Sequence, residues 1–74
     1  MSKLPQVSGR QCIKALVTVG FRVRRQKGSH VTLTRDEPFA QVIIPDHREL
    51  APGTLRTIIR QAGLSIEDFI ALLD

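Results

Sequence analysis

The residues best suited to chemistry in this 74-residue chain lie between Phe21 and Arg35, where one histidine, His30, is surrounded by cations. Five of these fifteen residues are basic and none is acidic, the basic ones being Arg22, Arg24, Arg25, Lys27 and Arg35. The side chain of histidine ordinarily titrates near pH ~6.5, so it can act as a general acid or base near neutrality. A titratable imidazole among fixed positive charges suits phosphodiester chemistry.

RNA is a phosphodiester that such a site can cleave without a metal ion, because its 2′-hydroxyl is a built-in nucleophile. A general base, a general acid and positive charge near the phosphate then suffice. Gly28 and Ser29 precede His30 and allow a phosphate backbone to approach closely. The candidate phosphate ligands beside them are Arg22, Arg24 and Lys27. The residues alone leave open the alternative that His30 is a solvated polar residue.

The second histidine, His47, is the candidate for the complementary acid or base, with a loop residue that helps cap the following helix as the alternative. We expect no metal site and no cofactor, because the two histidines are seventeen residues apart and belong to no ligand cluster. Cys12 lies beside an apolar stripe and is expected in the core. A helix-turn-helix near Arg60–Asp68 is rejected, because its second helix lacks the cations that contact phosphate.

The position of His30 depends on a hairpin, because apolar and polar residues alternate on both sides of Gly28. Directly opposed residues share a face of a sheet. A two-residue turn at Lys27-Gly28 opposes Val23 to Thr32 and mixes the faces. We therefore predict a three-residue loop at residues 27–29.

That loop gives a definite register for the predicted hairpin. The expected pairs are Gln26 with His30, Arg24 with Thr32, Val23 with Leu33 and Arg22 with Thr34. This register places Arg22, Arg24 and His30 together on a face that no helix covers. Arg25 is predicted on the apolar side, with its charged end reaching out to water.

Helices are predicted on both sides of the strands. A capping box, Ser8 with Gln11, begins a helix over about residues 9–19, and Gly20 ends it. A third strand spans residues 40–44, with Val42 facing inward. A second helix begins near Pro52 and ends at Gly63, and a short helix follows Ser65. The order predicts an α+β fold with three antiparallel strands and helices on one face, which resembles the double-stranded-RNA-binding fold.

Composition limits the class of protein. Residues 1–35 carry eight cations and no carboxylate, whereas residues 36–74 carry three cations and seven carboxylates. This asymmetry favours a polyanionic ligand for the first half, with a solvated basic surface as the alternative. We expect one domain over residues 1–74, in the cytoplasm, since the N-terminus lacks the apolar core of a signal peptide and no stretch is long enough for a membrane span.

Four motifs, in order and covering Ser8 to Phe69, resemble the HicA toxin family. They are Lys27-Gly-Ser-His30 before alternating apolar residues, Ile44-Pro-x-His47, Pro52-Gly-Thr-Leu-Arg-x-Ile59 and Ala62-Gly-Leu-Ser-x-Glu-x-Phe69. The resemblance implies a double-stranded-RNA-binding-like fold and a ribonuclease that cleaves mRNA. It implies His30 as the catalytic histidine and a HicB-like antitoxin as partner of a monomeric toxin in a hetero-oligomeric complex. A non-catalytic double-stranded-RNA-binding module and a pure protein-interaction domain are the other hypotheses.

Overall fold

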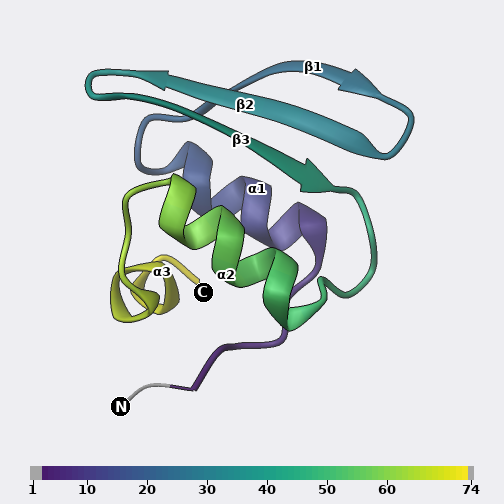
Figure 1. Cartoon of the computed structure of the whole chain (residues 1–74), viewed down its shortest axis with the longest axis vertical. Helices are drawn as coiled ribbons and strands as arrows, with labels where there is room; N and C mark the ends of the chain where they lie inside the picture. The colour runs from purple at the N-terminus through teal and green to yellow at the C-terminus, as the bar shows by residue number, and fades with distance from the viewer. Residues whose placement is uncertain (1–2, 74) are drawn as a thin grey trace.

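The protein, described by a computed structural model over residues 3–73, is a three-stranded sheet with helices on one of its faces (Figure 1). The elements in order are α1 (Gly9–Val17), β1 (Arg22–Lys27), β2 (His30–Asp36), β3 (Phe39–Pro45), α2 (Pro52–Gln61) and α3 (Ile66–Ala71). All strands are antiparallel, in the order β1-β2-β3. The predicted α+β class and element order are confirmed. None of the helices within the described residues reaches the length and apolarity that a membrane crossing requires.

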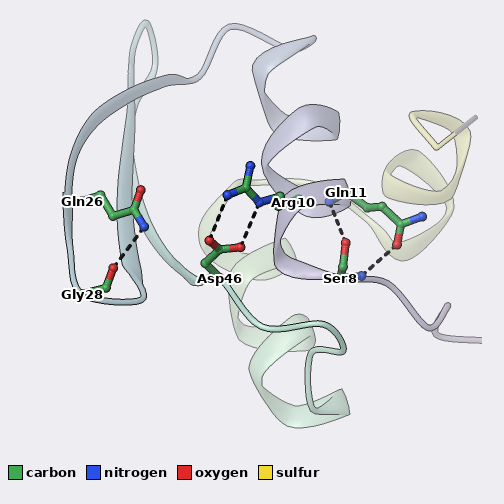
Figure 2. Close-up of polar contacts among 6 residues, drawn as sticks. All are labelled: Ser8, Arg10, Gln11, Gln26, Gly28 and Asp46. Atoms are coloured by element: carbon green, nitrogen blue, oxygen red, sulfur yellow. Dashed lines mark hydrogen bonds and ion pairs between the residues drawn. The ribbon is translucent and has the colours of Figure 1, made fainter.

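The predicted helix caps form as expected. The Ser8 hydroxyl accepts a hydrogen bond from the Gln11 N–H at 3.0 Å, and the Gln11 side chain accepts one from the Ser8 N–H at 2.8 Å (Figure 2). Helix α1 ends at Val17, earlier than predicted, because the N–H groups of residues 18–20 bond to carbonyl oxygens three residues back instead of four. The chain then reverses at Gly20, which has a φ of 98°. The Phe21 N–H then donates to the Leu16 carbonyl oxygen at 3.2 Å and closes the helix end.

The core lies between the helices and the inner faces of β2 and β3. Val31 and Leu33 from β2 and Val42 and Ile44 from β3 are all buried, as predicted. The helices contribute further buried apolar side chains, which include Leu16, Leu55, Ile58, Ile59 and Phe69. Cys12 is fully buried among them, so its predicted place in the core is confirmed. Desolvation by burial raises the pKa of the Cys12 thiol to about 12.

The predicted hairpin register is correct at the start of β1 and wrong near the turn. Arg22 pairs with Thr34 and Val23 with Leu33, as predicted. Beyond them a β-bulge makes Arg24 the extra residue, and the pairs become Arg25 with Thr32, Gln26 with Val31 and Lys27 with His30. The connection is therefore the two-residue turn Gly28-Ser29 and not the three-residue loop. The faces do not mix because the bulge shifts the parity of β1 by one residue.

Strand β1 extends past the helical layer. Val23 is opposite Leu33 and belongs to the inner face, yet 51% of it is exposed. All six residues of β1 are exposed, because the helices cover the sheet mainly at β3. Val23 is on the predicted face but outside the core, since an inward orientation buries a side chain only where another element packs against it. Strand β1 is thus exposed on both faces, whereas Val31 beside it in β2 is buried.

The start of α1 is fixed against the end of β3. The Gly9 N–H donates to the His47 carbonyl oxygen at 2.8 Å. Gly9 is buried, and a Cβ added to it would overlap the Pro45 carbonyl oxygen. Only a glycine allows this approach of the two backbones. Because Pro45 is the cross-strand partner of His30, the contact also holds the part of the sheet that carries the histidine.

Candidate active site

A shallow hollow on the open face of the sheet contains His30. It has a volume of about 320 Å³ and is lined by Arg25, Lys27, His30, Thr32 and Ile43. The residues come from all three strands, near the hairpin end of the sheet. His30 is exposed, so its imidazole is accessible to a ligand lying across the strands.

Two cations of β1 adjoin His30 as a consequence of the observed register. Lys27 is the direct cross-strand partner of His30, and Arg25 opposes Thr32, which lies two residues further along the same face. Opposed side chains have Cβ atoms roughly 5 Å apart. The lining of the hollow contains two fixed positive charges and no carboxylate. Such a lining attracts an anion and can stabilise negative charge that develops beside the imidazole.

The predicted site residues Gly28 and Ser29 form the turn that precedes His30. Gly28 has a φ of 59°, which fits the first position of a type II′ hairpin turn. The Gln26 side-chain amide donates to the Gly28 carbonyl oxygen at 3.0 Å (Figure 2). On the other side, the Asp46 N–H donates to the Ser29 carbonyl oxygen at 2.6 Å. These two hydrogen bonds hold the turn, and therefore His30, in place.

The other predicted cations are placed less favourably. Arg22 forms an exposed ion pair with Asp36 at 3.2 Å. It lies five residues from Lys27 along β1, which corresponds to roughly 16 Å of extended strand. Arg24 is the extra residue of the bulge, between the pair of Val23 with Leu33 and the pair of Arg25 with Thr32. Neither arginine lines the hollow.

Arg25 is the site residue that the sequence reasoning missed. It was predicted on the apolar side, whereas the bulge places it on the face of His30. The available signal was the Gly28-Ser29 dipeptide, because a glycine at the first turn position is typical of two-residue hairpins. A two-residue turn there, combined with the pairing of Val23 and Leu33, requires one extra residue in β1.

The structure places His47 in the loop that follows β3, where it is exposed. It lies two residues beyond Pro45 and does not line the hollow of His30. The expectation that it helps to cap α2 is wrong, since the N-cap of α2 is Ala51 and receives no side-chain hydrogen bond. Its neighbour Asp46 forms an ion pair with Arg10 at 3.3 Å (Figure 2).

Possible metal ligands do not gather anywhere in the described part of the chain. Within residues 3–73, no group of three or more His, Cys, Asp or Glu side chains is arranged to hold a metal ion. The ionisable side chains that line the hollow are the imidazole of His30 and the two cations Arg25 and Lys27.

Comparison with known proteins gives one family. The model of the family described as "HicA toxin of bacterial toxin-antitoxin" matches residues 9–64. The matched segment begins at the first residue of α1, includes the whole sheet with the hollow of His30 and ends just after α2. It covers about three quarters of the chain. No curated protein matches the chain.

Proposed function

The chain belongs to the HicA toxin family of bacterial toxin–antitoxin systems, and from that premise we propose that it is an endoribonuclease that cleaves mRNA without a metal ion. His30 is its general acid or base. The observation that carries this proposal is the exposed imidazole in a hollow that two cations line and no carboxylate lines. RNA is the substrate that matches these groups, because it supplies both the negative charge and the nucleophile.

In the proposed reaction the 2′-oxygen attacks the adjacent phosphorus atom and the bond to the 5′-oxygen breaks. The 2′-hydroxyl loses one proton and the leaving 5′-oxygen gains one, so the products are a 2′,3′-cyclic phosphate and a free 5′-hydroxyl. His30 performs one of these two proton transfers. A positioned group of this kind contributes about 10²–10⁴-fold to the rate. Lys27 and Arg25 stabilise the additional negative charge on the phosphorane.

The remaining predicted residues act along the RNA. Gly28 and Ser29 form a narrow turn beside the scissile phosphate, and Arg24 and Arg22 contact phosphates further along the strand. His47 is our candidate for the second acid or base, since it follows closely after the cross-strand partner of His30. Residues 1–74 act as a single HicA-like domain in this proposal. A HicB-like antitoxin binds the monomeric toxin in a hetero-oligomeric complex and inhibits it.

The experiment uses a short RNA labelled at both ends, incubated with the purified protein and excess chelator. We expect cleavage to products with cyclic phosphate ends. A matched RNA with a single 2′-deoxynucleotide at the cleavage position should resist cleavage there, because it lacks the nucleophile. Cleavage that chelator abolishes contradicts the metal-free reaction. Binding without cleavage favours the second hypothesis, a non-catalytic module, which the double-stranded-RNA-binding order of elements supports.

A further inference from the structure

The two edges of the sheet differ in how they are protected. Edge strands present unpaired N–H and C=O groups, and proteins protect them with charges, bulges or covering elements. Strand β1 has such protection, since four of its six residues are cations and it contains the bulge at Arg24. Strand β3 is seven residues long, carries no charge and pairs with β2 without irregularity.

The pairing of β2 with β3 indicates which backbone groups face the free edge. In antiparallel strands, pairs that exchange hydrogen bonds alternate with pairs that do not. The Asp46 N–H donates to the Ser29 carbonyl oxygen, so Ser29 and Asp46 form a hydrogen-bonded pair one step beyond the strands. Counting every second pair from there, Val31 with Ile44 and Leu33 with Val42 are also hydrogen-bonded pairs. The N–H and C=O of Gln41 and Ile43 therefore point away from β2. Within residues 3–73, no other element pairs with this edge.

A groove runs along this edge between β3 and α2. Its volume is about 670 Å³, and its lining includes Gln41 and Ile43 from β3 and Gly53, Thr54, Thr57 and Gln61 from α2. The lining contains no charged residue. Neutral side chains beside an open sheet edge fit an added β-strand, whose backbone pairs with β3 and whose alternate side chains enter the groove. Nucleic acid is disfavoured here, because no cation contacts its phosphates.

Ile43 connects this groove with the candidate active site. It lines both the groove and the hollow of His30, and 49% of it is exposed. A protein strand on the edge of β3 therefore lies next to the hollow. A toxin requires a partner that blocks its site, and the edge of β3 gives such a partner a place to bind beside that site.

We propose that the free edge of β3 is the docking site of the antitoxin, which adds a neutral β-strand to the sheet by hydrogen bonds to Gln41 and Ile43. This inference rests on the proposed inhibition by an antitoxin. A second copy of the toxin is a poorer occupant, because symmetric pairing of β3 with β3 would set one concave groove against another. One short strand falls short of the roughly 1,200 Å² of a stable interface. The same antitoxin is therefore expected to extend over the open face and cover His30.

The test uses the protein encoded by the open reading frame adjacent to the toxin gene, purified and titrated onto the toxin. Gln41→Pro removes an outward N–H and blocks strand addition without removing a bond to β2. Val23→Pro is the matched control. Val23 lies opposite Leu33, and the backbone N–H and C=O of Leu33 bond to β3. The Val23 N–H therefore points away from β2, at the other edge of the sheet. We expect Gln41→Pro to weaken binding about tenfold or more and Val23→Pro to leave it within about twofold.

Residue-resolved amide exchange on the wild-type toxin tests the same proposal without a variant. The Gln41 and Ile43 amides should exchange fast in the free toxin and become protected in the complex. Equal affinity of Gln41→Pro and wild type, or no protection at these amides, overturns the proposal. Toxin dimers that Gln41→Pro dissociates, or no binding of the adjacent protein to folded toxin, also overturn it. RNA cleavage by free Gln41→Pro is measured separately, so loss of the proposed ribonuclease function is distinguished from loss of docking.

Discussion

At the scale of single residues, the chemistry of the site depends on which side chains share a face with His30. Arg25 and Lys27 line the hollow, whereas Arg22 is paired with Asp36 at the far end of the strand. We therefore propose that Lys27 and Arg25 contribute most to phosphate binding and that Arg22 contributes least. The register predicted from the sequence favoured Arg22 and Arg24 over Arg25, because it has no β-bulge between β1 and β2.

Replacement of Arg25 tests this ranking. Arg25→Ala should weaken RNA binding and reduce the slope of log affinity against log salt by about 0.7, the value for one phosphate contact with a single strand. Arg60→Ala removes the same charge from an exposed position on α2 and should leave the slope unchanged. Binding measured by fluorescence anisotropy at several salt concentrations gives both slopes. Equal slopes for Arg25→Ala and wild type would remove Arg25 from the phosphate site.

Cys12 gives a prediction about pH. Its pKa is about 12 in the folded protein against an ordinary value of 9.0, so between these values the folded state holds a proton that the unfolded state has lost. The free energy of unfolding should therefore decrease as the pH rises through this range and stay unaffected by this thiol below it. Urea unfolding of wild type and Cys12→Ala from about pH 8 to about pH 10.5 measures the effect. The stability advantage of wild type should shrink with rising pH, and a constant difference would contradict the burial of the thiol.

At the scale of elements, most of the fold follows from local sequence. The capping boxes at Ser8 and Ser65, the glycines after the helices and Pro52 mark the helix ends, and the structure confirms them. The inward faces of β2 and β3 follow from simple alternation. The bulge at Arg24 was not predictable in this way, because it depends on the combination of a turn type with pairing further along the strand. Exposure of Val23 depends on where the helices end in space, which no local pattern specifies.

The turn that precedes His30 should be sensitive to the replacement of Gly28. Gly28 has a positive φ, so Gly28→Ala should lower the free energy of unfolding by about 1–2 kcal/mol. Gly53→Ala is the control, since a Cβ there meets no atom within 4 Å and its φ is ordinary for a helix. It should leave stability unchanged or slightly raised. Equal effects of the two substitutions in urea unfolding would argue against the two-residue turn.

At the scale of the whole molecule, the basic hairpin lies over a small core that buries the inner side chains of β2 and leaves β1 exposed. Figure 1 shows both large helices beneath the sheet and the hairpin end reaching beyond them. The contact of α1 with the end of β3 at Gly9 joins the helical layer to the strand opposite His30. Positive charge is concentrated in the first half of the chain, which supplies the hairpin and the lining cations.

Gly9→Ala tests this connection between core and site. The added methyl group must displace the Pro45 backbone, so unfolding should become easier by about 1–3 kcal/mol. Because Pro45 pairs with His30, RNA cleavage at a temperature where the variant remains folded should also decrease. Circular dichroism establishes folding, and a cleavage assay gives the rate. A stable variant with wild-type cleavage would show that this contact does not position the site.

The proposed acid–base catalysis by His30 is tested by comparing three forms of the protein. Initial rates of RNA cleavage in excess chelator are measured for wild type, His30→Ala and His47→Ala, with circular dichroism to establish folding. We predict that His30→Ala loses about 10²-fold or more in rate while it still binds RNA, because the lining cations remain. Cleavage by His30→Ala at the wild-type rate would contradict the account.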